Sequence, residues 1–146
     1  MRYHADLERI LMPTQALTTT SFEQTVLDND IVLVDFWASW CGPCRTFGPI
    51  FEKASMTHPD IVLGKVDTQD EPSLAAAARI TSIPTLMAFR EGILVFSQPG
   101  ALPAASLEQV IAGVRALEMD DLRAQASESP GAKSKAGDSP TARTTS

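Results

Sequence analysis

Cysteine is scarce in this sequence: only two are present among 146 residues. Two cysteines cannot form the several disulfides that hold small secreted scaffolds together. No apolar run approaches the roughly 18–20 uncharged residues that a membrane-spanning helix needs. The first residues, MRYHADLERIL, are interrupted by charged side chains and lack the apolar core of a secretory signal peptide. These absences predict a soluble cytoplasmic protein that has no membrane partner.

Basic charge is also low. The sequence contains 12 Lys and Arg residues and 18 Asp and Glu residues, which gives a formal net charge of −6. Binding to nucleic acid requires clustered Lys and Arg side chains that neutralise phosphates, so this class of partner is excluded. Hydrophobic residues make up 44% of the chain, which suits one globular domain of about 100–150 residues.

Apolar residues are nearly absent from the C-terminus. Residues 127–146 contain no Leu, Ile, Val or aromatic residue, so they have little to bury against the entropy of ordering and are predicted to be a disordered tail. Residues 1–13 are interpreted as an N-terminal extension, poorly ordered or helical. The folded domain is therefore predicted over residues 14–126, with its core in residues 14–117.

Strand and helix patterns alternate along that domain. Two nearly unbroken apolar runs, residues 31–38 and 61–67, are typical of strands buried on both faces of a sheet. Residues 85–89 and 93–96 are joined by a short Gly-containing turn and indicate a hairpin. A weaker strand is predicted over residues 15–18.

Four helices are predicted between and after these strands, over residues 21–28, 41–57, 70–79 and 103–126. Thr20 and Glu23 have the spacing of a capping box, and Asp70 is the predicted N-cap of the third helix. The order is β-α-β-α-β-α-β-β-α. It predicts an α/β protein in which helices flank both faces of a central mixed β-sheet.

Both cysteines lie in the segment Trp40-Cys41-Gly42-Pro43-Cys44, between a predicted strand and a predicted helix. A structural zinc site needs four ligands, and His58 has no second histidine three to five residues later, so no metal is expected. A purely structural disulfide is also disfavoured, because closing so short a loop constrains the unfolded chain little. The pattern favours a redox-active pair.

The predicted helix start gives this pair its chemistry. Unpaired backbone N–H groups and the positive end of the helix dipole would stabilise the thiolate of Cys41 over its thiol. Cys44 lies one turn further along the helix, within reach of Cys41 for an intramolecular disulfide. Pro43 fixes its own φ angle and stiffens the turn between the two sulfurs.

The segment VDFWASWCGPC and the Ile-Pro-Thr sequence at 83–85 resemble the thioredoxin family over residues 14–117. Asp35, Pro49, Lys65, Gly92 and the Gly100-Ala101 pair fall where the family pattern expects them. The resemblance implies the thioredoxin fold, a monomer and protein-disulfide reductase activity on disulfide-containing cytoplasmic targets. It also implies that no cofactor is bound, and that electrons come from NADPH through a flavin-containing thioredoxin reductase.

The resemblance also implies roles for individual residues. Cys41 would be the attacking thiolate, Cys44 would resolve the mixed disulfide, and Pro84 would be the family's cis-proline. An apolar surface that grips an extended target segment would be formed by Trp40, Gly42, Pro43, Ile83, Pro84, Gly100 and Ala101.

Asp35 is the most informative polar residue, because strand alternation places it on the same face as Ile31, Leu33 and Trp37. The functional interpretation is that burial raises its pKa and that it relays a proton from Cys44, with Lys65 as its charge partner. The alternative is a structural carboxylate that is satisfied by hydroxyls or one ion pair. Trp37 itself is interpreted as core.

Pro99 departs from the family pattern, which has an apolar Val beside the glycine, and it removes a backbone donor next to the predicted target surface. A function from another class also remains open. The chain could be a thioredoxin-fold binding subunit that recruits a partner through this surface, with its redox chemistry incidental.

Overall fold

The computed structural model describes residues 13–128, which divide after Arg115 into two compact units. The predicted N-terminal extension, apart from Pro13, and residues 129–146 of the predicted tail lie outside the described residues. No helix in the described part of the chain is long and apolar enough to cross a membrane.

A five-stranded mixed sheet forms the centre of the first unit, in the order β1-β3-β2-β4-β5. β1, β3 and β2 are parallel, whereas β4 runs antiparallel to β2 and β5 runs antiparallel to β4. The strands are β1 (Gln15–Ala16), β2 (Ile31–Trp37), β3 (Val62–Asp67), β4 (Thr85–Arg90) and β5 (Ile93–Pro99). The predicted α/β class and mixed sheet are confirmed.

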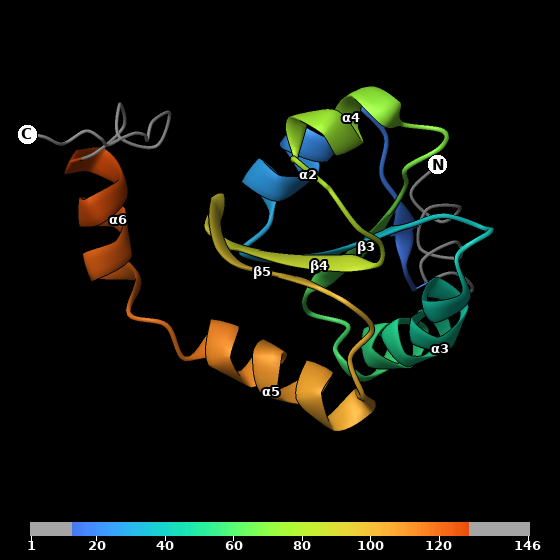
Figure 1. The fold of residues 1–146 in the computed structure, drawn as a ribbon. Coiled ribbons are helices and arrows are strands. Elements are labelled where there is room, and N and C mark those ends of the chain that lie inside the picture. Colours follow the sequence, from blue (N-terminus) through green and yellow to red (C-terminus); the bar gives the residue numbers. More distant parts are fainter. Residues whose placement is uncertain (1–12, 129–146) are drawn as a thin grey trace, which may run out of the picture. The chain divides into compact units, whose positions relative to one another are not determined.

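Helices cover both faces of this sheet (Figure 1). On one face lie α3 (Gly42–Thr57) and α5 (Ala104–Arg115), and on the other lie α2 (Phe22–Asp28) and α4 (Pro72–Ala77). Each face has its own hydrophobic core: Phe47 of α3 and Ile111 of α5 belong to one, Val26 of α2 and Leu74 of α4 to the other.

The central strand β2 contributes to both cores in alternation, as the sequence predicts. Leu33 packs in the core beneath α3 and α5, whereas Val34 and Phe36 pack in the core beneath α2 and α4. Asp35 is therefore directed into the α3 side of the sheet, and its side chain is fully buried.

The hairpin between β4 and β5 turns at Glu91 and Gly92, whose φ angles are 53° and 79°. Two successive positive φ angles are typical of a type I′ turn, and glycine adopts such a φ without steric strain. β5 is an edge strand that ends at Pro99, a position where proline is tolerated because no further strand needs its N–H group.

Both predicted N-caps are wrong. α2 begins after Ser21 with no side-chain cap, because the Ser21 hydroxyl instead accepts a hydrogen bond from the Thr18 backbone N–H at 3.0 Å. α4 begins after Glu71 rather than after Asp70. The Glu71 carboxylate bonds to the backbone N–H and hydroxyl of Thr19 at 2.9 and 2.8 Å, a long-range contact that sequence spacing does not reveal.

α4 and α5 are both shorter than predicted. α4 stops at Ala77, and Arg79 beyond it has a φ angle of 59°, which a helix cannot contain. α5 stops at Arg115, because the guanidinium of Arg90 donates to the carbonyls of Val114 and Arg115 at 2.8 and 3.1 Å. The single helix predicted over residues 103–126 is therefore wrong.

The second unit contains α6 (Met119–Glu128), which includes residues 127 and 128 that the sequence assigned to a disordered tail. Its first turn carries Asp120 and Asp121, where negative charge is favourable beside the N-terminal end of the helix dipole. Arg123 pairs with Asp120 one turn away.

Candidate active site

The two cysteines lie at the start of α3, directly after the loop that follows β2. Cys41 is the N-cap residue of the helix, and Cys44 is in its first turn. A disulfide joins them, with their Cα atoms 5.2 Å apart. Both side chains are buried, so burial does not distinguish one cysteine from the other.

Hydrogen bonding does distinguish them. The sulfur of Cys41 accepts a hydrogen bond from the Cys44 backbone N–H at 3.1 Å, one of the amides that a helix start leaves without a partner. The same donor would stabilise a negative charge on this sulfur once the disulfide opens. Cys41 is therefore the cysteine whose thiolate the fold favours.

A loop at the start of β4 meets this pair. The Ile83–Pro84 peptide bond is cis, as the family resemblance implies and as sequence statistics alone would not predict. The Ile83 carbonyl oxygen lies 3.7 Å from the Cys41 sulfur. The Pro84 carbonyl accepts a hydrogen bond from the Gly100 N–H at 2.7 Å, and Gly100 has a φ angle of 99° that favours glycine.

This contact and this hydrogen bond bring together three segments that are predicted from the sequence to form one target-binding surface. Trp40 is 61% exposed, a high value for so large an apolar side chain. Gly42, Pro43, Gly100 and Ala101 are exposed, whereas Ile83 is half-buried and Pro84 is buried. The loop that carries Trp40 and the strand end at Gly100 are linked through Ile83 and Pro84.

Asp35 is buried without compensation. Its side chain is 0% exposed, and neither carboxylate oxygen has a hydrogen-bond partner among residues 13–128. Burial raises the pKa of Asp35 to about 7, and the nearby positive charge of Lys65 only partly opposes this increase. The structural alternative, a carboxylate satisfied by hydroxyls or an ion pair, receives no support from these contacts.

Lys65 is opposite Asp35 in the register of β2 and β3. Its ammonium nitrogen, however, lies 4.9 Å from the centre of the Trp37 ring, in cation–π geometry. Trp37 is predicted from the sequence to be a core residue, and this contact is not predicted. The available signal was that Trp37 shares a strand face with Asp35, two residues further along.

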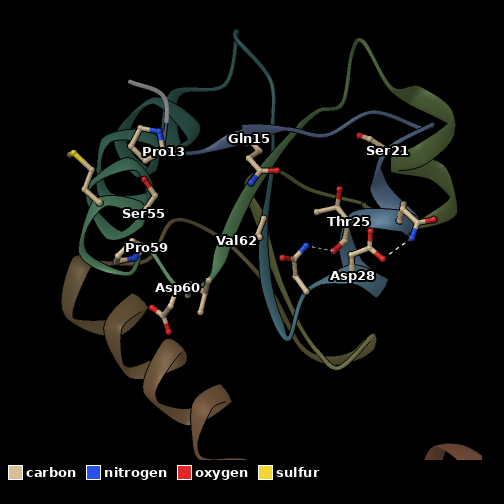
Figure 2. A pocket seen from close by; sticks show the side chains of 13 residues that line it. Pro13, Gln15, Ser21, Thr25, Asp28, Ser55, Pro59, Asp60 and Val62 are labelled. Carbon is tan, nitrogen blue, oxygen red and sulfur yellow. Dashed lines mark hydrogen bonds between the residues drawn. The ribbon is translucent and has the colours of Figure 1, made fainter. Parts of the chain in front are cut away.

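A pocket of about 810 Å³ lies elsewhere in the first unit (Figure 2). α2 contributes Thr25 and Asp28, β1 contributes Gln15, and the end of α3 contributes Ser55. Its lining includes no cysteine and none of the residues that contact the disulfide. Within residues 13–128, no cluster of His, Cys, Asp and Glu side chains could hold a metal ion.

The central sheet, the disulfide at a helix start and the adjacent cis-proline together define a thiol–disulfide oxidoreductase with the thioredoxin fold. Comparison with known proteins gives the same class. The family model described as Thioredoxin matches residues 13–113, and the chain belongs to the thioredoxin family.

Putative thioredoxin 2 of Streptomyces coelicolor is 58% identical over 110 residues, which cover 75% of this chain and 82% of that protein. Thioredoxin of Porphyra purpurea is 44% identical over 102 residues, which cover 68% and 95%. Among solved structures, a mutant thioredoxin from Halobacterium salinarum matches with a TM-score of 0.67 at 30% identity, covering 73% of this chain and 95% of that one.

Proposed function

We propose that this chain reduces disulfides in cytoplasmic target proteins, with Cys41 as the attacking thiolate and Cys44 as the resolving thiol. The observation that carries this assignment is the hydrogen bond from the Cys44 backbone N–H to the Cys41 sulfur at 3.1 Å. A donor fixed at the helix start stabilises the thiolate before a target arrives, and the thiolate is the nucleophile in disulfide exchange.

The first step forms a mixed disulfide. The Cys41 thiolate attacks one sulfur of the target disulfide, the target S–S bond breaks, and the second target sulfur leaves as a thiolate. Trp40 and the Pro84 loop would hold the target beside Cys41, with extended backbone pairing near Pro84. The exposure of Trp40, at 61%, supports a surface that is covered when a target binds.

The second step releases the target. Cys44 loses its proton to the Asp35 carboxylate and attacks the Cys41 sulfur, which breaks the mixed disulfide and forms the Cys41–Cys44 disulfide that the structure contains. The target leaves with both of its sulfurs reduced. Asp35 suits this transfer, because its pKa of about 7 lies close to a neutral working pH.

Two electrons must then return to the Cys41–Cys44 disulfide. We assign their delivery to NADPH through thioredoxin reductase, so that the chain itself needs no bound cofactor. A reducing cytoplasm would keep the pair in its dithiol form between turnovers. We further propose that the chain acts as a monomer and that residues 1–13 and 127–146 flank the catalytic domain.

NADPH oxidation coupled to insulin reduction, in the presence of a thioredoxin reductase, tests this function. Sustained turnover is expected from the natural chain and none from the Cys41→Ser/Cys44→Ser double variant. The double variant also tests the alternative of a binding subunit. If a cell keeps its phenotype when both cysteines are replaced, the chain acts there through its target-binding surface and not through its redox chemistry.

A further inference from the structure

The position of the Lys65 ammonium is unexpected for a lysine opposite a buried carboxylate. Asp35 and Lys65 are register partners on neighbouring parallel strands, yet neither oxygen of Asp35 has a hydrogen-bond partner within the described chain. The ammonium instead lies 4.9 Å from the centre of the Trp37 ring, on the same strand face as Asp35. The Lys65 ammonium therefore has two potential partners, the Trp37 ring and the Asp35 carboxylate.

α3 leaves room for this arrangement at Gly48. A Cβ atom placed on Gly48 would lie 4.0 Å from the Lys65 nitrogen, so the ammonium is close to the backbone of the helix. A long side chain at this position would compete for the same space. The Trp37 ring on β2 and the bare backbone at Gly48 are therefore the two surfaces that the ammonium approaches.

We propose that Trp37 is a positioning residue, whose ring holds the Lys65 ammonium away from Asp35 and so keeps the carboxylate an effective proton acceptor for Cys44. The consequence for catalysis rests on the proposed function, whereas the positioning itself can be measured in the oxidised protein without any reaction.

The physical reason is a competition for one cation. A lysine paired directly with Asp35 would stabilise the ionised carboxylate and make it a weaker base. An aromatic face attracts an ammonium through its quadrupole, and tryptophan does so more strongly than phenylalanine or tyrosine. The ring therefore limits how far Lys65 can oppose the effect of burial, which raises the pKa of Asp35 to about 7.

One further charged residue lies near Lys65 in the described chain: Asp67 is the register partner of Trp37 on β3, and its carboxylate accepts a hydrogen bond from the Gln69 backbone N–H at 2.9 Å. The side chains on the Asp35 face include Leu86 from β4, Leu107 from α5 and Phe47 from α3, none of which titrates. Cys44 of α3 is held in the disulfide and carries no titratable proton. Among the described residues, Lys65 is the charge that acts on the Asp35 carboxyl.

NMR titration of the Asp35 carboxyl carbon in the oxidised chain tests the proposal. Trp37→Leu removes the ring and is expected to lower the pKa of Asp35 by about 0.5–1 unit, as Lys65 turns toward the carboxylate. Trp37→Phe keeps a weaker ring and is expected to lower it by less. If Trp37→Leu does not fold, the decrease in the pKa of Asp35 in Trp37→Phe is the deciding measurement. An unchanged or raised pKa in the folded variants would overturn the proposal.

A smaller side chain could also lower this pKa by admitting water. The same Trp37 substitutions are therefore repeated in a Lys65→Met background, where the proposal expects them to have no effect on the Asp35 titration. A shift of equal size in both backgrounds would refute positioning through Lys65. If Asp35→Asn leaves the pH–rate profile unchanged while the titration shifts persist, the proton-transfer role fails and the positioning stands.

Discussion

The sulfur of Cys41 and the backbone N–H of Cys44 are hydrogen-bonded at 3.1 Å across the first turn of α3. The bond makes the two cysteines unequal although both are equally buried. In the proposed mechanism, this bond places a fixed donor on the sulfur that carries the negative charge, whereas Cys44 depends on a base to lose its proton. Asp35, buried and without a hydrogen-bond partner in the described chain, is that base in the proposed mechanism.

Ionisation of Asp35 should lower the free energy of unfolding of the oxidised chain as pH rises. The pKa of Asp35 is about 7 in the folded chain against the usual 3.8 of an aspartate, so the folded state keeps the proton to higher pH than the unfolded state does. Stability linked to this proton is complete below pH ~4 and is lost as pH rises through 7. The difference corresponds to about 4 kcal/mol as an order of magnitude, at about 1.36 kcal/mol per pKa unit.

Asp35→Asn removes this titration. We therefore expect the free energy of unfolding of the variant, relative to the natural chain, to increase between pH 4 and 7 and to level off above pH 8. Denaturant unfolding at several pH values measures it, and the comparison across pH cancels the constant effect of changed packing. A relative stability that stays flat across this range would show that Asp35 ionises as an ordinary carboxyl.

The same substitution should slow disulfide reduction in a pH-dependent way. Cys44 loses its proton acceptor, so the rate should decrease most near neutral pH. The general-base contribution is typically about 100-fold or more. The deficit should shrink above pH ~9, where a thiol with an ordinary pKa of about 8.5 ionises unaided. Rates of insulin reduction across pH measure this, and an equal loss at every pH would return Asp35 to a structural role.

The ion pair between Asp60 and Arg115 should stabilise the fold at every pH except strongly acidic values. Arg115 donates to the two Asp60 oxygens at 2.7 and 3.0 Å, and this hydrogen bonding lowers the pKa of Asp60 to about 2. The stabilisation is present above pH ~4 and is lost as pH falls through 2. Asp60→Asn should reduce the Tm by no more than a few degrees at pH 7, because the pair is exposed. Thermal melts at pH 7 and pH 2 check that this difference disappears in acid.

Pro99 should restrict which targets can extend the sheet. Gly100 donates inward to Pro84, and successive N–H groups alternate along a strand, so the Pro99 nitrogen faces the open edge of β5. Pro99→Val restores a donor there without breaking a sheet hydrogen bond. We expect it to lower KM about twofold to tenfold for an extended disulfide peptide that binds along this edge. A peptide panel assayed with Pro103→Val as a matched control measures this, and an unchanged KM would contradict it.

The sequence predicts best those features that depend on local patterns. Alternation along residues 31–37 places Asp35 correctly, because a strand buried on both faces must send successive side chains to opposite cores. Helix ends are predicted poorly, because long-range contacts decide them: Glu71 bonds to Thr19, and Arg90 satisfies the last carbonyls of α5. Spacing along the chain carries no information about such partners.

The candidate active site likewise combines features that local sequence patterns predict and features that depend on long-range contacts. Its residue types and spacing identify the cysteine pair, and the resemblance to a family supplies the proline loop and its cis bond. The side-chain position of Lys65 could not be predicted, because β2–β3 register allows either Asp35 or Trp37 to receive the ammonium. The Lys65 nitrogen also lies near the α3 backbone at Gly48, a neighbour that is distant in sequence.

Trapping of covalent target adducts tests the central claim most directly. Cys44→Ser leaves the attacking thiolate but removes the resolving thiol, so mixed disulfides should accumulate on Cys41 with a model disulfide protein such as insulin. Cys41→Ser, its matched control, should trap few adducts because its remaining thiol lacks the stabilising donor. Mass spectrometry of the non-reduced reaction mixtures measures both. Abundant adducts with Cys44→Ser alone are the predicted result, and equal trapping by the two variants would contradict the assignment of Cys41 as the nucleophile.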